Sequence, residues 1–357
     1  VLKNAQNIAG PLLLHVLTRK GYGYLPAELE PERFHGASPF DRESGKFHKK
    51  AGKPAYTSVF RDALVDLARR DDRVVAITAA MTLGTGLDRF AEEFPDRFYD
   101  VGIAEQHAVA FAGGLANAGL RPVAAIYSTF MQRAYDQVFQ EICLQDVPVV
   151  LMMDRAGVVG ADGPTHHGVF DLSFLRTLPN LGIIAPRDEN ELRRAVLSSV
   201  QFNKPVAVRY PRGSGEGVTI QNDPEPMKWG CGEILREGDD ITVLAVGPLV
   251  YKALETAEKL AMDKISVEVI DSRFIKPLDT NLILNSLRKT GALITMEENA
   301  VAGGFGSAVM EALIGYDINM QHIDILGVPD RWVPMGTQDE LRAEIGLTAL
   351  ELERRIR

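Results

Sequence analysis

Residues 98–116, FYDVGIAEQHAVAFAGGLA, contain a short strand that ends near Val101 and run directly into a predicted helix. Glu105 lies in the first turn of that helix, where the helix dipole stabilises a carboxylate. The junction is typical of an open α/β sheet, in which ligands bind beyond the carboxyl ends of the strands. Chemistry alone leaves two interpretations of Glu105 open: a residue that merely stabilises its helix, or a functional carboxylate at a strand end.

Short apolar runs alternate with amphipathic stretches on both sides of this junction, which predicts parallel sheets covered by helices. In the first series, strands are predicted at 74–78, 122–127, 148–153, 182–185 and 206–210, and helices at 56–70, 104–118, 131–144 and 188–202. In the second series, strands are predicted at 241–246, 266–271, 292–297 and 322–326, and helices at 251–261, 279–289 and 304–313. The predicted fold class is α/β, with two doubly wound domains.

Two irregular segments separate these series from each other and from the start of the chain. Residues 213–238 are rich in Gly, Pro and acidic residues and predict a domain boundary. Residues 21–55 have little periodicity and predict a functional loop or a linker. Before them, residues 11–16 predict a buried strand, and the first residues have no small-residue cleavage site of a signal peptide. We therefore expect the chain to have been cut from a longer protein.

Composition excludes several classes of protein. Lys and Arg number 39 against 48 Asp and Glu, a formal charge of −9 without a basic block, which argues against a general nucleic-acid binder. The longest apolar stretch, 108–131, is interrupted by Gly, Asn, Arg and Pro, so no membrane span is predicted. Cys143 and Cys231 have neither ligand spacing nor a disulfide framework, which favours a reducing, cytoplasmic setting.

Three further clusters of polar residues follow predicted strands. The first is DRAGVVGADGPTHHG (154–168), with Arg155, Asp162 and two adjacent histidines. It is either a functional Gly-rich loop or a plain turn, whose histidines both lie in a surface loop or divide into one core and one solvated residue. No third ligand at metal spacing accompanies the pair. The others are YSTFMQRAYDQ (127–137), with Tyr127, Phe130 and Arg133, and VRYPRGSG (208–215), with Arg209 and Arg212. Arginine suits phosphate, but spacing alone does not separate these side chains from core and surface residues.

Taken in order, the motifs resemble one family. They are GYGYLPAE (21–28), FHG (34–36), IAEQHAV (103–109), IYSTFMQRAYDQV (126–138), DRAGVVGADGPTHHG (154–168), RYPRG (209–213), RFIKPLD (273–279) and GTQDELRAEIGL (336–347). Together they resemble the 1-deoxy-D-xylulose-5-phosphate synthases over essentially the whole chain. A glutamate at a strand–helix junction is shared with transketolases and with β subunits of 2-oxoacid dehydrogenases, whereas the FHG and DRAGVVGADGPTHHG motifs are more specific to the synthases.

The resemblance implies a domain organisation. Residues 1–52 would be a remnant of the diphosphate-binding domain and its linker, and 53–215 the pyrimidine-binding domain of a thiamine-diphosphate enzyme. Residues 216–226 would be a linker, and 227–357 a transketolase C-terminal-like domain. The Gly-Asp-Gly and asparagine motif that holds Mg²⁺ and diphosphate in the family does not occur in the sequence. We therefore expect the metal ligands in an N-terminal diphosphate-binding part and expect this chain alone to be inactive.

The resemblance also implies an activity. The family uses thiamine diphosphate and Mg²⁺ to condense pyruvate with D-glyceraldehyde 3-phosphate, giving 1-deoxy-D-xylulose 5-phosphate and CO₂. This transferase reaction is the first step of the non-mevalonate isoprenoid pathway and supplies precursors for thiamine and pyridoxal. The family works as cytoplasmic homodimers.

Roles follow residue by residue from the same resemblance. Glu105 would hydrogen-bond the aminopyrimidine ring of the cofactor, Phe130 would stack on it, and Tyr24 would contact it. His35 and His166 match histidines near the reacting carbons. The residues that match the aldehyde-phosphate pocket are Arg155 and Arg212, which would grip the phosphate, with Tyr127, Arg133 and Asp162 around them.

Two alternatives remain. A β subunit of a 2-oxoacid dehydrogenase has a similar length and the same two domains, but the GYGYLPAE-to-FHG segment argues against it. The other alternative is a non-catalytic dimerisation fragment. Glu105, Arg155, His166 and Arg212 are all present, which argues against decay of a parent enzyme.

Overall fold

The structure is a computed structural model that describes residues 1–48 and 52–357. The chain forms two compact units, Val1–Gly52 and Lys53–Arg357. Within the described residues, no helix has both the length and the apolar character needed to cross a membrane.

The first unit contains little regular structure. Its helices are α1 (Leu2–Ala5) and α2 (Leu25–Leu29). Residues 11–19 belong to no helix or strand, and the side chains of Leu13 and Leu17 are 92% and 84% exposed. The prediction of a buried strand at 11–16 is therefore wrong for this structure. An apolar run becomes a strand only where a neighbouring strand pairs with its backbone, and within the described residues none does.

The second unit contains two sheets, of which the larger has seven strands in the order β10-β5-β6-β4-β3-β1-β2. The strands are β1 (Val74–Thr78), β2 (Phe98–Asp100), β3 (Arg121–Tyr127), β4 (Val150–Asp154), β5 (Gly182–Ile184), β6 (Val206–Arg209) and β10 (Phe274–Lys276). All pair in parallel except β10, which joins the edge antiparallel to β5 and lies where no strand was predicted, between the elements of the second series. Strands β1 and β4 are buried along their whole length, as expected for parallel strands covered on both faces.

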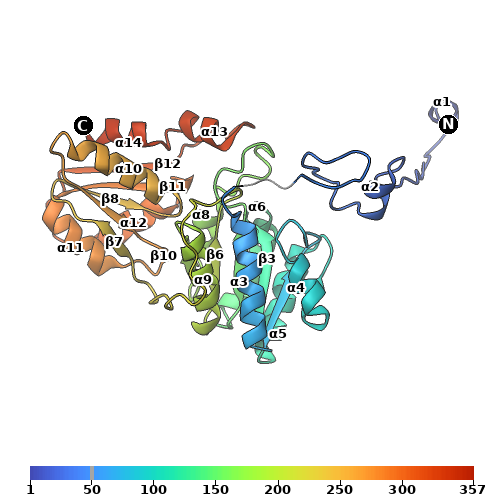
Figure 1. Ribbon diagram of the computed structural model, residues 1–357, viewed down its shortest axis with the longest axis horizontal. Coiled ribbons are helices and arrows are strands. Elements are labelled where there is room, and N and C mark those ends of the chain that lie inside the picture. Colours follow the sequence, from blue (N-terminus) through green and yellow to red (C-terminus); the bar gives the residue numbers. More distant parts are fainter. Residues whose placement is uncertain (49–51) are drawn as a thin grey trace. The chain divides into compact units, whose positions relative to one another are not determined.

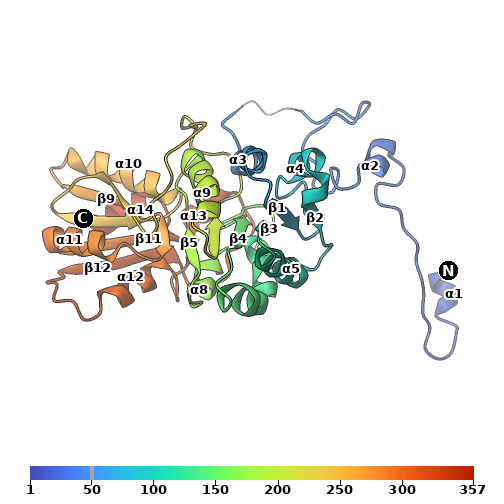
Figure 2. The same ribbon diagram turned by 90° about the horizontal axis from the view of Figure 1, so that it is seen from below.

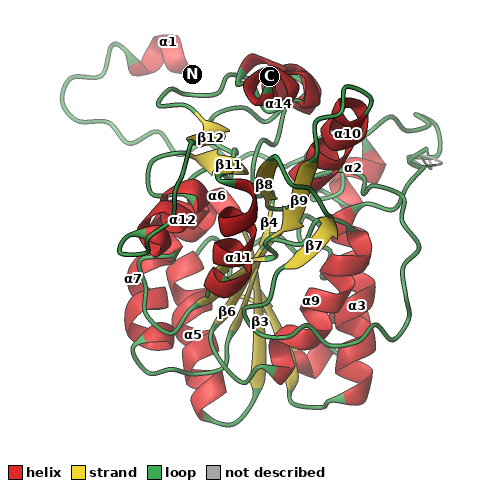
Figure 3. Ribbon diagram, turned by 90° about the vertical axis from the view of Figure 1, so that its left-hand side faces the viewer, coloured by secondary structure: helices red, strands yellow, loops and turns green. Residues whose placement is uncertain are grey.

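Helices cover both faces of this sheet. Helices α3 (Tyr56–Arg70) and α9 (Glu189–Gln201) pack together on one face, and α5 (Glu105–Asn117) lies on the other (Figure 3). Shorter helices are α4 (Asp88–Glu93), the 3₁₀ turn η1 (Pro95–Arg97) and α8 (Asp171–Leu175). The predicted helices at 56–70, 104–118 and 188–202 are thus found within a residue or two of their predicted ends.

The smaller sheet has five strands in the order β12-β11-β8-β9-β7 (Figure 1). They are β7 (Glu233–Arg236), β8 (Ile241–Ala245), β9 (Val267–Asp271), β11 (Ala292–Ala300) and β12 (His322–Val328). Its helices are α10 (Leu249–Ala261), α11 (Thr280–Thr290), α12 (Phe305–Leu313), α13 (Gln338–Glu344) and α14 (Ala349–Ile356). Helix α12 lies on the opposite side of the sheet from α10 (Figure 2). The predicted class of two doubly wound α/β domains is confirmed.

The prediction of one regular helix at 131–144 is wrong. This stretch is divided into α6 (Ser128–Met131), the 3₁₀ turn η2 (Gln132–Ala134), α7 (Tyr135–Gln137) and a π-helical segment, η3 (Val138–Cys143). The backbone of Ala134 leaves helical geometry, with φ −108° and ψ 13°. A Cβ atom on Gly113 of α5 would lie 2.7 Å from the Glu141 carbonyl, so helix α5 packs here without room for a side chain. Apolar periodicity does not distinguish these helix types.

The segment between the two sheets is fastened to helix α9. Glu189 is fully buried, and its carboxylate accepts the backbone N–H groups of Glu216 (2.8 Å), Gly217 (2.6 Å) and Val218 (3.2 Å). These contacts join one sheet's helix to the start of the predicted linker at 216–226. The boundaries of that linker stay a prediction, but the backbone of its first three residues is hydrogen-bonded to Glu189.

Glu189→Ala should therefore lower the free energy of unfolding of this chain by about 2–3 kcal/mol, because three N–H groups lose a charged acceptor. Denaturant unfolding monitored by circular dichroism measures the change. Glu258→Ala, on the exposed side of α10, is the matched control and should change stability by less than about 0.5 kcal/mol. Equal effects of the two substitutions would show that the Glu189 contacts do not stabilise the fold.

Candidate active site

The carboxyl ends of the parallel strands bring the candidate residues of the second unit together. The strand order reverses at β1, which lies between β2 and β3, and such a switch point is where open sheets bind ligands. Tyr127 is the last residue of β3, Arg155 directly follows β4, and Arg212 lies three residues after β6. The loop that contains Gly84 follows β1 at the same edge.

Tyr127 lies at the centre of this cluster. The Arg155 guanidinium is 4.1 Å from the centroid of the Tyr127 ring, a cation–π contact. The Phe130 ring stacks with the Tyr127 ring, with centroids 5.7 Å apart and planes 10° apart, and the Phe130 and His166 rings form a T-shaped pair with centroids 5.4 Å apart. Burial raises the pKa of Tyr127 to about 12, so its hydroxyl is a neutral hydrogen-bond donor at physiological pH.

Two polar contacts hold the side chain of Arg155. Its Nη1 donates to the carbonyl of Gly84 (2.7 Å), its side chain pairs with Asp154 (3.0 Å), and its backbone has a positive φ of 62°. Asp154 is completely buried, and burial raises the pKa of its carboxyl while the guanidinium opposes that rise. Thr57 Oγ1 donates to the second oxygen of Asp154 (2.7 Å). Arg155, with a side chain only 16% exposed, is therefore a fixed positive charge at the strand edge.

Arg212 supplies a second, more accessible positive charge. Its Nη1 donates to Asp162 (2.6 Å), and both side chains are more than a third exposed. The positive charges of Arg155 and Arg212 oppose the rise in the pKa of Tyr127, and the negative charge of Asp162 adds to it. The cluster thus combines two guanidinium groups with one exposed and one buried carboxylate.

Glu105 forms a separate part of the site with Arg133. It is the first residue of α5, and its side chain is almost completely buried. Arg133 Nη1 lies 3.1 Å from Glu105 Oε2, yet within the described residues that oxygen accepts no aligned hydrogen bond. A buried carboxylate oxygen that still lacks a hydrogen-bond donor is what a cofactor ring with an N–H group requires. The structure therefore pairs Arg133 with Glu105 and not with Asp162, whose partner is Arg212.

The two adjacent histidines differ in burial. His166 is half-buried, and its Nδ1 lies 2.8 Å from the hydroxyl of Thr165. His167 is buried; its Nδ1 accepts the Val159 N–H (3.0 Å), and its Nε2 lies 3.0 Å from the carbonyl of Pro334. This matches the alternative of one core histidine beside a more accessible one. His167 bridges the loop after β4 to the loop before α13, a role that no spacing in the sequence indicates.

Tyr24 and His35 lie in the first unit and are described within it. The Tyr24 hydroxyl donates to the carbonyl of Arg42 (3.0 Å), and its ring packs near Phe34 and Phe40, with centroids 5.6 and 5.9 Å away. His35 is exposed next to Phe34. Their predicted contacts with cofactor and substrate stay predictions.

Comparisons with known proteins identify the family of this chain. Residues 52–216 match the family model for the transketolase pyrimidine binding domain, and residues 230–352 match that for the transketolase C-terminal domain. A solved structure described as a split gene transketolase, inactive beta4 tetramer, is 33% identical with a TM-score of 0.76, covering 85% of this chain and 97% of that chain. This chain belongs to the transketolase family. A transketolase structure from Campylobacter jejuni has a TM-score of 0.71 over 92% of this chain and 50% of its own; at 18% identity it shows the shared fold alone.

Curated relatives of this transketolase-family chain carry a more specific name. A 1-deoxy-D-xylulose-5-phosphate synthase 1 of Geobacter sulfurreducens is 55% identical over 350 residues, which cover 98% of this chain and 55% of that protein. A 1-deoxy-D-xylulose-5-phosphate synthase of Heliobacterium modesticaldum is 51% identical over 356 residues, 99% of this chain and 55% of that protein. The predicted resemblance to these synthases is confirmed. The chain spans little more than half the length of the relatives.

Proposed function

We propose that this chain forms the pyrimidine-binding and C-terminal parts of a transferase that condenses pyruvate with D-glyceraldehyde 3-phosphate. The products are 1-deoxy-D-xylulose 5-phosphate, which feeds isoprenoid, thiamine and pyridoxal biosynthesis, and CO₂. The proposal rests on three side chains at the carboxyl ends of the parallel strands. They are the buried carboxylate of Glu105 and the guanidinium groups of Arg155 and Arg212. The named relatives support it. The complete enzyme would act as a cytoplasmic homodimer, and the 357 residues alone would be inactive.

Thiamine diphosphate is the cofactor that these residues fit. The fit rests on Glu105, whose Oε2 is buried and accepts no aligned hydrogen bond within the described residues. When bound, the cofactor supplies the carbanion chemistry that decarboxylates pyruvate and joins the remaining two carbons to the aldehyde. Glu105 would share a hydrogen bond with the ring nitrogen of the cofactor's aminopyrimidine, and Phe130 would offer the ring a stacking surface. Tyr24 would add a contact from the first unit.

Mg²⁺ and the diphosphate would be held by a separate diphosphate-binding domain. Within residues 1–48 and 52–357, no three His, Cys, Asp or Glu side chains are grouped so that they could hold a metal ion. A cofactor bound between such a domain and Glu105 has its two ends fixed by different parts of the enzyme. Glu105 of this chain would thus act on the pyrimidine ring of the cofactor, and the other domain would bind the metal.

The aldehyde phosphate would bind to Arg155 and Arg212. The side chain of Arg155 is pre-oriented by Asp154 and Gly84, so it would lose little conformational entropy when the phosphate binds. The side chain of Arg212 is more exposed. On binding, it would leave Asp162 for the phosphate or contact both groups. Tyr127 donates from the centre of the cluster. Arg133, which pairs with Glu105, would line the same pocket.

The two histidines would act on protons. His166 has Nδ1 against the Thr165 hydroxyl, which assigns proton transfer to Nε2. His35 would approach from the first unit to orient pyruvate or to move a proton at the aldehyde oxygen.

The test is a turnover assay of the complete protein that contains this chain, with thiamine diphosphate and Mg²⁺. Arg212→Ala should raise KM for D-glyceraldehyde 3-phosphate by about 10–100-fold, because a charge-assisted contact to phosphate is lost. KM for pyruvate should stay within about twofold, and Arg331→Ala, an exposed arginine before α13, is the control. An unchanged KM for the phosphorylated aldehyde would remove Arg212 from the phosphate site. Absence of ketose phosphate with the wild-type protein would refute the proposed function itself.

A further inference from the structure

Val158, in the loop after β4, has both of its backbone polar groups bound by side chains from the far end of the chain. Its N–H donates to Glu298 Oε2 (3.2 Å), and its carbonyl accepts from Gln338 Nε2 (2.7 Å). Val158 is completely buried, so neither group has water as an alternative partner. The loop that begins at Arg155 is thus held by residues of β11 and α13.

Gln338 makes a second contact that joins this loop to another part of the site. The same Nε2 donates to the carbonyl of Arg212 (3.2 Å). An amide nitrogen has two hydrogens, so one side chain satisfies two carbonyls. Gln338 is the first residue of α13, and Thr337 and Glu340 form a capping box that fixes this helix start. The bridge is therefore built on a rigid element.

We propose that Gln338 is a positioning residue that sets the separation of the two arginines at the strand edge. Val158 lies three residues after Arg155, and the second carbonyl belongs to Arg212 itself. Without Gln338, the strand ends of β4 and β6 still fix where each segment begins, but among the described residues no other side-chain donor joins Val158 to Arg212. The inference rests on the proposed function, since it takes the bound group to be the phosphate of the aldehyde substrate.

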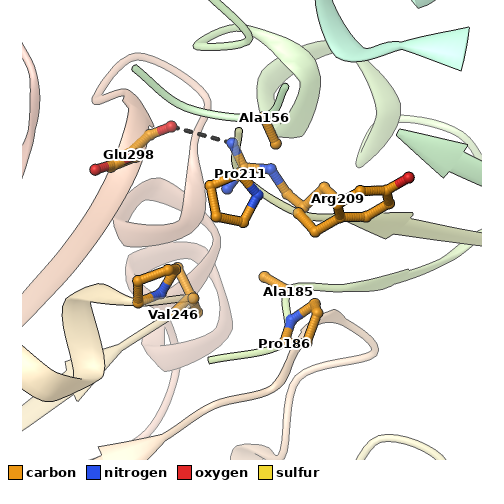
Figure 4. Close-up of a pocket in the computed structure, with 10 residues that line it drawn as sticks. Ala156, Ala185, Pro186, Arg209, Pro211, Val246 and Glu298 are labelled. Carbon is orange, nitrogen blue, oxygen red and sulfur yellow. Dashed lines mark hydrogen bonds between the residues drawn. The ribbon is translucent and has the colours of Figure 1, made fainter. Parts of the chain in front are cut away.

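The surrounding contacts make the expected effect local. Glu298 is ion-paired with Arg342 of α13, and its backbone carbonyl accepts from Arg209 Nη2 (3.1 Å) beside a small pocket that Ala156 and Pro186 also line (Figure 4). His167 adds its contact with Pro334. Because these contacts remain when Gln338 is changed, the loop is expected to stay folded and lose only its link to Arg212.

The test compares Gln338→Glu and Gln338→Ala with Asp339→Ala in the complete protein. Glutamate keeps the shape of glutamine but, when ionised, donates to neither carbonyl, so it removes the bridge without creating a cavity. Asp339 is the next residue of the same helix and its side chain is 97% exposed. Steady-state KM and kcat are measured for pyruvate, D-glyceraldehyde 3-phosphate and unphosphorylated D-glyceraldehyde. Hydrogen exchange is measured by mass spectrometry over 156–160 and 211–213.

Both Gln338 variants are expected to raise KM for the phosphorylated aldehyde by about 5–20-fold, while KM for pyruvate and for unphosphorylated D-glyceraldehyde stays within about twofold. Amide exchange in the two segments is expected to be about tenfold faster, and Asp339→Ala should match the wild type in every readout. Equal rises in KM for all substrates would show that Gln338 only stabilises the fold. Faster amide exchange without a change in KM would overturn its positioning role. If the wild-type protein makes no ketose phosphate, the proposed function fails. Amide exchange can be measured whether or not the protein is active, and unchanged exchange in the Gln338 variants would overturn this inference in either case.

Discussion

Glu105→Ala in the complete protein lowers kcat by an expected factor of about 10³ or more, because each ~1.4 kcal/mol of lost transition-state stabilisation is tenfold in rate. Glu105 is the proposed hydrogen-bond partner of the cofactor ring, and its buried oxygen has no aligned hydrogen-bond donor in the described residues that would give it a structural role. The measurement is turnover of pyruvate and D-glyceraldehyde 3-phosphate at saturating cofactor. Near-normal turnover would remove Glu105 from the catalytic machinery.

Stability distinguishes this loss from unfolding. The contact of Glu105 with the half-exposed Arg133 contributes little, so Glu105→Ala should change the free energy of unfolding by no more than about 1 kcal/mol. A gain in stability is also consistent, because a buried carboxylate with an oxygen that accepts no hydrogen bond is itself unfavourable. Glu92→Ala, on the exposed side of α4, is the control and should leave turnover unchanged. A large loss of stability in Glu105→Ala would show that the residue mainly stabilises helix α5, which is the simpler of the two interpretations.

Arg155→Met is expected to lower the free energy of unfolding by about 3–5 kcal/mol, because it leaves Asp154 buried without its counter-charge. Asp154 is completely buried, and Thr57 remains as its side-chain hydrogen-bond donor. The effect is measured by denaturant unfolding of this chain alone, so it does not depend on the proposed activity. The double variant Asp154→Asn/Arg155→Met removes the unpaired charge and should recover a large part of the loss. No recovery would show that the packing of Arg155 on Tyr127 and its bond to Gly84, rather than the ion pair, stabilise the loop.

The same variant should make stability depend on pH. Burial raises the pKa of Asp154, and Arg155 opposes that rise, so removing Arg155 raises the pKa further. Between its unfolded and folded pKa values this carboxyl binds more protons in the folded state. The free energy of unfolding therefore falls as pH rises through the folded pKa. Arg155→Met should be destabilised least at acidic pH and most at alkaline pH. An equal loss at every pH from 5 to 8 would contradict a charge effect.

The two series of strands and helices were predictable because each element is periodic in itself. The run VVAIT is strand β1 because β-branched residues fit a strand buried on both faces, and the pattern of 56–70 is helix α3 end to end. Strand β10 was not predictable. It joins a sheet built almost a hundred residues earlier in the chain, and pairing at that distance leaves no local pattern.

The candidate site was predictable as a set of strand ends but not as a set of contacts. Parallel strands end at one edge, so Tyr127, Arg155 and Arg212 had to be neighbours. Their partners were not predictable. Arg133 pairs with Glu105, and neither that pairing nor the contacts of Asp154 and Gln338 gave a signal in the sequence.

The sequence by itself determined the α/β class, the place of each main strand and helix, and which chemical groups stand at the strand ends. These follow from periodicity and from the rule that parallel strands share an edge, both of which are local or topological. Only the tertiary structure decided which carboxylate neutralises which arginine, and that residues of β11 and α13 hold the loop after β4. The two contacts that hold the loop at Val158 join residues 140 and 180 positions apart, and the energies of all these contacts depend on burial that no single stretch of sequence contains.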